Sequence, residues 1–378
     1  MAIQLISVAL ALFTGVYVVL VGYMRRGWDR IPFFIRNGAK PRTKVSVLIA
    51  ARNEEANIGR TLTAVLRQDF PKELLEVIVV DDHSTDGTSD VVRSFSGQGV
   101  RLLSLNESEP LNSYKKKAIT TAIAEATGHY IITTDADCRM GPDWLATVVT
   151  FMEREDCFLL SSPVVYSEQR GFFEELQTLE FLYLIGLGAA GIGNRHPSTC
   201  NGANLAYRRD IFYEVGGFNG IDHVASGDDE LFLHKIATHY PDKIRFCKSR
   251  EAIVYTDAKR TLRGFIGQRR RWASKSTHYK DRGVVALGIS IWLFNVFLLA
   301  SAGGALLAER ALWTCFLLAA ALKFVAELVF LHPLCRFAKR TDLLWFLPLL
   351  TLLHILYMVY IGIAGNLGKY QWKGRRVR

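Results

Sequence analysis

Residues 45–55, VSVLIAARNEE, pass abruptly from an apolar run to a polar cluster. Hydrophobic residues then recur at helical spacing over residues 58–66. Further short apolar runs end at Val80, Leu105 and Thr134, with helical spacing between them. Strands that are apolar on both faces and alternate with amphipathic helices form parallel sheets covered by helices on each side. The pattern therefore predicts an α/β domain with a mostly parallel central sheet.

Polar residues gather where three of the predicted strands end, at 52–55, 81–86 and 135–137. In open parallel sheets, ligands bind beyond the carboxyl ends of the strands. The arrangement is typical of a nucleotide-binding domain, and these three clusters form its candidate site.

The two ends of the chain have a different composition from this middle part. Half of the 378 residues are apolar, and the surplus lies in long apolar runs near both termini, one of which contains the charged residues Lys323 and Glu327. Runs of this length predict membrane-spanning helices, and the first lacks the basic start and the cleavage site of a secretory signal. The predicted order is an anchor at 1–24, a basic juxtamembrane linker at 25–43, the α/β domain at 44–282, three transmembrane helices at 283–366 and a basic tail at 367–378.

Basic residues exceed acidic ones by 46 to 36, which gives a net charge of +10. Much of the excess lies beside apolar runs, where it suits anionic membrane lipids and not nucleic acid. The arginines at 25–30 predict that the α/β domain is cytosolic and that the cell's inner membrane holds the protein. Three further crossings would send the tail to the opposite side, although its positive charge favours the cytosol. The sequence leaves the number of spans open.

Asp135 and Asp137 lie two residues apart at the end of a predicted strand. Two carboxylates in one exposed loop suit a divalent cation, Mg²⁺ or Mn²⁺, which prefers carboxylate oxygens together with substrate phosphates. The alternative is that this pair stabilises a turn or caps a helix. The six cysteines have neither a paired nor a metal-ligand spacing, so they indicate no disulfide framework and no zinc site.

Asp81 and Asp82 end another predicted strand. A carboxylate at this place can accept hydrogen bonds from a uracil imide or a ribose hydroxyl. The alternative is that residues 82–86 form a turn that caps the next helix. The two interpretations are compatible.

Six motifs follow one another along the chain: VSVLIAARNEEANI, VIVVDDHSTDGT, IITTDADC, CNGANLAYRRDIFYEVGGF, SGDDELFL and QRRRW. In their order and spacing they resemble those of the membrane-bound family 2 glycosyltransferases, which are inverting enzymes with the GT-A fold. The resemblance covers roughly residues 44–280. Relatives in this family include cellulose, chitin and hyaluronan synthases and ceramide glucosyltransferases.

The resemblance implies which residues bind the donor, a nucleotide-diphosphate sugar. The first nucleotide-contacting segment lacks the family's usual proline and tyrosine before the Asn-Glu pair. Lys115 matches a phosphate-facing lysine, but the run Lys115 to Lys117 leaves the register open. The implied donor residues are Ala51, Arg52, Glu54, Asp81, Asp82, Lys115 and Asp135, and Asp135 and Asp137 are the implied metal ligands.

The pair Asp228 and Asp229 matches the catalytic acidic motif of the family. The resemblance implies that Asp229 is the general base, which removes the proton of an acceptor hydroxyl as that oxygen attacks the anomeric carbon. The alternative is that these acids complement the dipole at the start of a helix.

Two further motifs are expected to face the acceptor and the diphosphate. Gln268, Arg271 and Trp272 form Gln-x-x-Arg-Trp before the first closing apolar run. The alternative is that they anchor a helix at the membrane boundary. Asn201, Gly202 and Asn204 resemble the loop at the acceptor entrance, and the alternative there is a glycine turn before a strand.

The predicted function is inverting transfer of a sugar, with a UDP-sugar as the expected donor, to a lipid or glycan acceptor at the cytosolic membrane face. One alternative is a processive polysaccharide synthase of the same family. The alternative from another class is a catalytically degenerate membrane scaffold subunit. The oligomeric state is not predicted.

Overall fold

The computed structural model describes residues 2–107, 111–167, 169–275, 279, 281–306, 310–365, 370–372 and 375–377. The chain forms two compact units, and each is described by itself. The helical unit contains residues 1–28, 169–186 and 259–370, and the α/β unit contains residues 29–168, 187–258 and 371–378.

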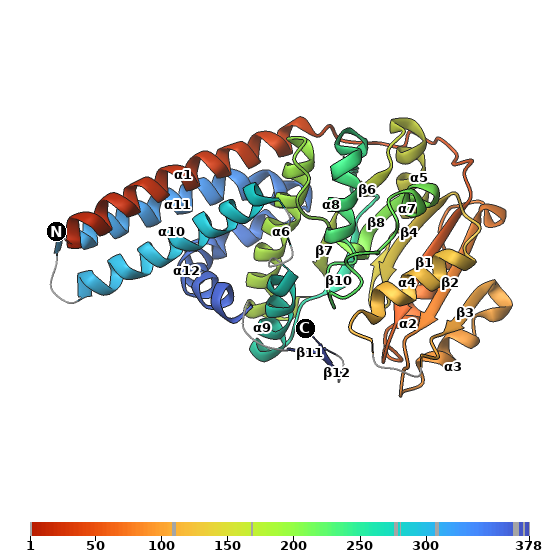
Figure 1. The fold of residues 1–378 in the computed structure, drawn as a ribbon. Coiled ribbons are helices and arrows are strands. Elements are labelled where there is room, and N and C mark those ends of the chain that lie inside the picture. The colour runs from red at the N-terminus through yellow and green to blue at the C-terminus, as the bar shows by residue number, and fades with distance from the viewer. Residues whose placement is uncertain are drawn as a thin grey trace. The chain divides into compact units, whose positions relative to one another are not determined.

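The α/β unit is built on a sheet whose first four strands confirm the predicted fold class. They run parallel in the spatial order β3-β2-β1-β4, as Figure 1 shows. In the register of this sheet, Ala51 pairs with Asp81 and Ala50 pairs with Asp135, so the polar clusters leave from one edge. The strands are β1 (Val45–Ala51), β2 (Leu75–Asp81), β3 (Val100–Ser104) and β4 (Tyr130–Asp135).

The sheet continues beyond β4 with antiparallel pairing. Strand β8 (Leu205–Arg208) lies between β4 and β6 (Leu159–Ser161) and is antiparallel to both, and β9 (Ile244–Phe246) is parallel to β6. A smaller sheet has the order β5-β10-β7. Its strands are β5 (Arg139–Met140), β7 (Val164–Ser167) and β10 (Val254–Asp257).

Short helices flank the large sheet, as expected for parallel strands joined by crossovers. Helix α4 packs against β1 and β2, and α3 packs against β3. The apolar residues of α2 predicted at helical spacing, Ile58, Leu62 and Val65, are buried. The helices are α2 (Ile58–Leu66), α3 (Thr88–Arg93), α4 (Tyr114–Glu125), α5 (Trp144–Glu155), α7 (Arg209–Glu214) and α8 (Glu230–His239).

The helical unit contains most of the long apolar helices. Five helices of the described residues are long and apolar enough to cross a membrane. Four of them contain the predicted spans, and their apolar windows are only 17–33% buried, whereas that of α6 is 72% buried. Helix α6 is therefore packed mainly inside the protein. The five helices are α1 (Ala2–Arg30), α6 (Phe172–Gly193), α10 (Arg282–Leu306), α11 (Arg310–Phe337) and α12 (Leu347–Ala364).

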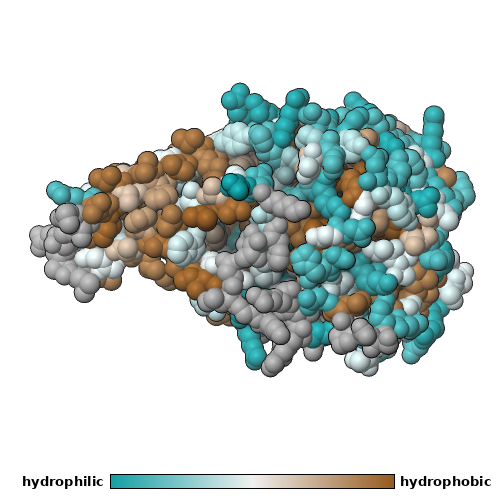
Figure 2. Space-filling view, viewed as in Figure 1, coloured by the Kyte–Doolittle hydropathy of each residue, from teal (hydrophilic) through white to brown (hydrophobic). Residues whose placement is uncertain are grey.

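Hydrophobic side chains cover the exposed surface of these long helices. Leu5, Val8 and Val19 of α1 are more than 60% exposed, and Figure 2 shows a continuous hydrophobic surface over this part of the protein. Apolar surface of this extent is typical of contact with lipid or with another protein.

A buried polar cluster ties three of these helices together. Glu327 of α11 pairs with Lys323 one turn earlier, and both side chains are at most 4% exposed. The Glu327 carboxylate also accepts hydrogen bonds from Tyr17 Oη of α1 at 2.8 Å and from Thr351 Oγ1 of α12 at 2.7 Å. The two charges inside the predicted span are thus paired and hydrogen-bonded, as charges in an apolar setting must be.

Candidate functional site

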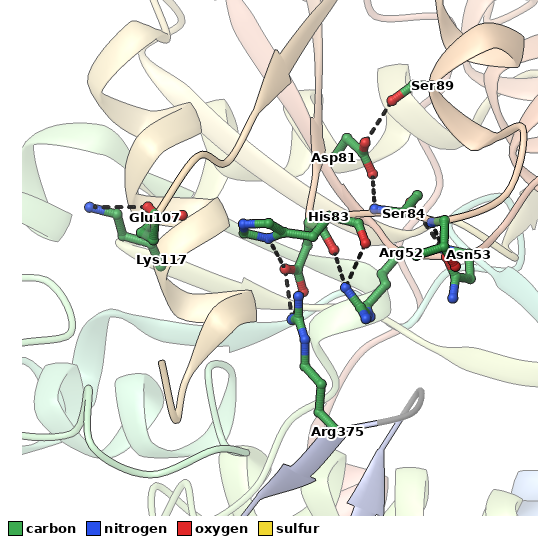
Figure 3. Close-up of polar contacts among 11 residues, drawn as sticks. Arg52, Asn53, Asp81, His83, Ser84, Ser89, Glu107, Lys117 and Arg375 are labelled. Carbon is green, nitrogen blue, oxygen red and sulfur yellow. Dashed lines mark hydrogen bonds and ion pairs between the residues drawn. The ribbon is translucent and has the colours of Figure 1, made fainter. Parts of the chain in front are cut away.

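The loops after β1 and β2 are locked together by backbone and side-chain hydrogen bonds. The amide of Asp82 donates to the carbonyl of Ala51 at 2.8 Å, which continues the strand pairing by one residue. Arg52 Nη1 donates to the carbonyl oxygens of Asp82 and His83, each at 2.7 Å. Figure 3 shows Arg52 reaching across to the loop of His83. Arg52 therefore shapes the backbone at this end of the sheet.

Both loops contain a non-glycine residue in the left-handed region, Asn53 with φ of 50° and His83 with φ of 53°. The Asn53 side-chain oxygen accepts a hydrogen bond from the backbone amide of Thr85 at 2.8 Å, and the backbone amide of Asn53 donates to Ser84 Oγ at 3.0 Å. Backbone of this kind is uncommon outside turns and sites with a special geometry. The contacts between the two loops hold it in place.

Asp81 and Glu54 mainly support these loops. The Asp81 carboxylate accepts hydrogen bonds from the amide of Ser84 at 3.1 Å and from Ser89 Oγ at 2.6 Å (Figure 3). The backbone of Glu54 accepts the amide of Ile58 at 2.9 Å and donates to Thr88 Oγ1 at 2.8 Å. Asp81 therefore supports the turn at 82–86, and Asp86 within that turn accepts the amide of Thr88, the first residue of α3, at 3.1 Å, as the turn and capping interpretation expected.

Asp82 has a different environment, because the end of the chain reaches it. Strand β12 (Arg375–Val377) pairs with β11 (Tyr370–Trp372), and Arg375 Nη1 lies 2.8 and 2.9 Å from the two carboxylate oxygens of Asp82. The Asp82 side chain is only 3% exposed. The guanidinium carbon of Arg375 also lies 3.4 Å from the centre of the Tyr114 ring. Figure 3 shows Arg375 rising from β12 into this cluster.

The structure separates the three lysines whose register the sequence left open. Lys115 faces the carboxylates of the candidate site. Lys116 is 2% exposed and donates to the carbonyls of Val224 and Ser226, at 2.5 and 2.8 Å. Lys117 is half exposed, and its Nζ lies 3.7 Å from Glu107 Oε1. Figure 3 shows this pair. Only the first lysine therefore takes the place expected of a phosphate-binding residue.

Lys115 brings two distant acidic motifs together. Its Nζ lies 2.9 Å from Asp135 Oδ1 and 3.1 Å from Asp228 Oδ2. Burial by itself would lower the pKa of Lys115, but the neighbouring carboxylates outweigh that effect and raise it. Those carboxylates are Asp135, Asp228 and Asp229. The ammonium is thus held charged at the point where the two motifs meet.

Asp229 is the N-cap of α8, as the alternative interpretation of this motif expected. Its Oδ1 accepts the amide of Glu230 at 2.7 Å, and its Oδ2 accepts the amide of Gly202 at 2.9 Å. The two backbone amides therefore fix the orientation of the Asp229 carboxylate.

A side chain at residue 202 would be tightly packed because the backbone of Gly202 lies directly against the acidic pair. A Cβ there would lie 3.3 Å from Asp229 Cβ and 3.4 Å from Asp228 Oδ2. Its carbonyl accepts a hydrogen bond from Thr133 Oγ1 of β4 at 2.8 Å, and the Asn201 side chain accepts the amide of Ala203 at 2.9 Å. The loop predicted to line the acceptor entrance therefore lies against Asp229.

The Asn204 side chain is buried and does not lie on the surface of this loop. It is 1% exposed, and its amide nitrogen donates to the carbonyls of Pro163 and Ala252, both at 2.8 Å. Its amide oxygen accepts the indole N–H of Trp144 at 2.9 Å. A side chain engaged in this way supports the core, so the expected acceptor role does not fit Asn204.

Asp135 and Asp137 are the residues that would hold a divalent cation. They flank Ala136 in the turn after β4, and both are partly exposed. Among the residues that the structure describes, no group of three or more His, Cys, Asp or Glu side chains is arranged to hold a metal by itself. Mg²⁺ commonly takes only one or two protein carboxylates and completes its coordination with substrate phosphates and water. The donor set therefore fits a cation that binds together with a diphosphate.

The Gln-x-x-Arg-Trp residues lie on α9 (Leu262–Ala273) of the helical unit. Arg269, which the motif does not specify, is 2% exposed and forms a buried ion pair with Glu180 of α6. Its guanidinium lies 4.3 Å from the centre of the Trp272 ring, and it donates to Gln268 at 2.7 Å. The Arg271 side chain has no hydrogen bond or ion pair with any other residue that the structure describes. Arg269 thus organises the motif, and Arg271 is available to an anion.

Sequence reasoning missed four residues that shape these sites. Lys116 and Arg269 are charged residues next to the predicted site residues Lys115 and Gln268. Their burial cannot be predicted from the sequence pattern. Tyr114 precedes the lysine run, and Arg375 looked like one of several tail charges. An aromatic residue beside a phosphate-binding lysine was the only available signal for Tyr114.

Comparisons with known proteins show what this chain is similar to. Residues 46–216 match the model of the family described as "Glycosyl transferase family 2". The "Probable glycosyltransferase YdaM" of Bacillus subtilis is 31% identical over 249 residues, which cover 63% of this chain and 56% of that protein. The glucosyl-dolichyl phosphate glucuronosyltransferase of Haloferax volcanii is 29% identical over 200 residues, which cover 51% of this chain and 61% of that protein. The chain thus matches little more than half of the length of these relatives.

Among solved structures, the mannosyltransferase PcManGT of Pyrobaculum calidifontis, in complex with GDP-Man and Mn²⁺, has a similar fold. The TM-score is 0.60 at 20% identity, over 94% of this chain and 99% of that one. The similarity confirms the predicted GT-A fold class. The family match confirms the predicted enzyme class for the matched segment.

Proposed function

Because residues 46–216 match the model of glycosyl transferase family 2, we propose that this chain transfers a sugar from a nucleotide-diphosphate donor to a lipid or glycan acceptor. One observation carries the proposal: Lys115 draws together Asp135, which follows β4, and Asp228, which precedes α8. A charged lysine among carboxylates at the carboxyl ends of the strands is a place where a diphosphate and an acceptor hydroxyl can meet.

In the proposed donor site, Asp82 accepts hydrogen bonds from the nucleoside, and Lys115 contacts the diphosphate. Asp135 and Asp137 would hold Mg²⁺ or Mn²⁺, which neutralises diphosphate charge when it is bound. The neighbour with GDP-Man and Mn²⁺ supports a nucleotide sugar and a cation for this fold. A UDP-sugar remains the expected donor.

Asp229 is the proposed general base. Its carboxylate accepts the proton of the acceptor hydroxyl while that oxygen forms a bond to the anomeric carbon. The bond from this carbon to the diphosphate oxygen breaks on the opposite face, so the configuration inverts and a nucleoside diphosphate leaves. The amides of Gly202 and Glu230 fix the carboxylate in position for this step.

The proposed location is the inner membrane, with the α/β unit in the cytosol. Four weakly buried apolar helices and the basic residues that follow the first of them support this location. The contact of Arg375 with Asp82 supports a tail on the same side of the membrane as the α/β unit, which its positive charge also favours. With the tail on that side, an even number of the closing apolar helices crosses the membrane. Of the predicted tail, residues 367–369, 373, 374 and 378 lie outside the described residues.

The experiment that tests this function uses the full chain in native membranes with Mn²⁺ and radiolabelled UDP-sugars or GDP-sugars. We expect label in the lipid extract for transfer to a lipid acceptor, or in polymer for a processive synthase, with release of nucleoside diphosphate. If no donor yields labelled product while the purified chain binds none of them, the proposed function is wrong and the scaffold alternative holds.

A further inference from the structure

Arg375 interacts with two groups that are suited to a nucleobase. Its Nη1 lies 2.8 and 2.9 Å from the two oxygens of Asp82, and its guanidinium carbon lies 3.4 Å from the centre of the Tyr114 ring. One flat group is therefore stacked on an aromatic face and hydrogen-bonded along its edge to a carboxylate.

A nucleobase makes the same two kinds of contact. Every base has a π-face that stacks on an aromatic side chain. The imide N–H of uracil and the edge N–H groups of guanine are donors that a carboxylate can accept. The planar guanidinium of arginine also stacks on aromatic rings and presents N–H donors in one plane. Arg375 is thus chemically similar to the group expected beside Asp82.

The residues around Arg375 are also held in place by contacts that do not involve Arg375. Arg52 fixes the backbone carbonyls of Asp82 and His83. The His83 ring packs edge-on at 5.8 Å from the Tyr114 ring, and its Nδ1 lies 3.1 Å from Asp82 Oδ1. A subsite built in this way persists when Arg375 leaves.

The positive charges of Arg52 and Arg375 also repel each other. Burial lowers the pKa of Arg52, and the nearby Arg375 lowers it further. The Asp82 carboxylate offsets part of this repulsion, and the departure of Arg375 would remove it.

We propose that Tyr114 and Asp82 form a nucleobase subsite and that Arg375 is an internal stand-in for the base, which the donor nucleotide must displace. The inference rests on the proposed function and adds a regulatory contact to it. Strand β12 then acts as a strap whose closed state competes with the donor. Competition of this kind multiplies the intrinsic affinity by the fraction of molecules in which the strap is open.

The test is isothermal titration of the full chain, in detergent or nanodiscs, with UDP and GDP in the presence of Mn²⁺. If the strap is closed in about nine-tenths of the molecules, Arg375→Ala should bind nucleotide about tenfold more tightly than the natural chain. Arg376→Ala removes the same charge from the next position and should bind like the natural chain. Unchanged or weaker binding by Arg375→Ala, or equal effects of both variants, would overturn the inference.

A second measurement follows the strap directly. Amide hydrogen exchange in residues 370–377 should become faster when saturating nucleotide is added to the natural chain. Exchange that stays constant or slows while nucleotide is bound contradicts displacement. Nucleotide binding without a strap response therefore refutes only this inference, whereas failure of UDP and GDP to bind to both the natural chain and Arg375→Ala refutes the proposed function.

The aromatic platform has its own matched pair of variants. Tyr114→Phe keeps the ring and should retain nucleotide affinity within about twofold. Tyr114→Leu removes the stacking face, which is worth roughly 1–3 kcal/mol per base, and should weaken binding about tenfold or more. Equal affinities of the two variants would show that the base does not stack on residue 114.

Discussion

The ammonium of Lys115 lies 3.1 Å from Oδ2 of Asp228, so α4 is joined to the loop that precedes α8. The same nitrogen lies 2.9 Å from Asp135 at the end of β4. A single cation thus links the residues proposed to bind the diphosphate and those proposed to activate the acceptor. Binding of a diphosphate at this point would give Lys115 a new partner and free Asp228.

We expect Lys115→Met to reduce kcat/KM for sugar transfer by about 10- to 100-fold. A charge-assisted hydrogen bond is worth about 1.5–3 kcal/mol, and the variant also leaves two carboxylates without their cation. Lys117→Met is the matched control. Lys117 is half exposed, and its ion pair among the described residues is with Glu107, away from Asp135 and Asp228. Equal activities of the two variants would show that Lys115 does not contact the reacting groups.

Lys116 should act through the position of the acidic pair. Its buried ammonium holds the carbonyls of Val224 and Ser226, just before Asp228. Lys116→Met leaves buried carbonyls without a donor, which costs about 1–3 kcal/mol each. We expect a lower melting temperature and reduced kcat, with the Kd for nucleoside diphosphate changed less than twofold. A loss of nucleotide affinity as large as the loss of kcat would contradict a positioning role.

The buried pair Lys323 and Glu327 gives a double-mutant test in the helical unit. Lys323→Met leaves Glu327 charged in an apolar setting and should destabilise the protein by about 3–5 kcal/mol. Adding Glu327→Gln to this variant should restore much of the stability, because no uncompensated charge remains. Thermal unfolding in detergent measures both. If the double variant is less stable than Lys323→Met, Glu327 is not the partner whose charge matters.

Glu76 on β2 should make the α/β unit sensitive to acid. Burial would raise its pKa, but hydrogen bonds from Ser46 and from the amide of Thr127 outweigh this and lower it. Because the folded pKa is below the unfolded one, the stabilisation is present above the unfolded pKa, near 4.3. It is lost as pH falls through the folded pKa.

Glu76→Gln should therefore reduce stability at neutral pH by on the order of 1 kcal/mol and flatten its dependence below about pH 5. Melting temperatures between pH 3 and pH 7 provide the measurement. Parallel pH profiles for the natural chain and the variant would contradict this assignment.

The parallel half of the sheet was predictable because its signal is local. The run 75–80 and its neighbours are apolar on both faces, and polar residues mark the strand ends, so Asp82 and Asp135 were found with their strands. Strand β8 was anticipated only as the strand after the possible glycine turn at 201–204, and the other strands after Met140 were not predicted, since they are only a few residues long and lack a regular pattern.

Residues that act through long-range contacts were not accessible to the same reasoning. The pairing of Arg375 with Asp82 joins the end of the chain to its second strand, and no spacing rule indicates it. Asn204 was assigned to the acceptor entrance because it belongs to a motif with Gly202, yet only the fold shows that its side chain enters the core. Sequence motifs therefore located the site but did not distinguish the residues that face it from those that support it.

The account depends most on Asp229 as the base beside Lys115 and Asp135, and single-turnover transfer by Asp229→Asn tests this directly. The amide keeps the shape of the side chain but removes the proton acceptor, and general base catalysis contributes about 100- to 10,000-fold. We predict a loss in that range, with the Kd for the donor nucleotide within about threefold of the natural value. Transfer at the natural rate by Asp229→Asn would contradict the account.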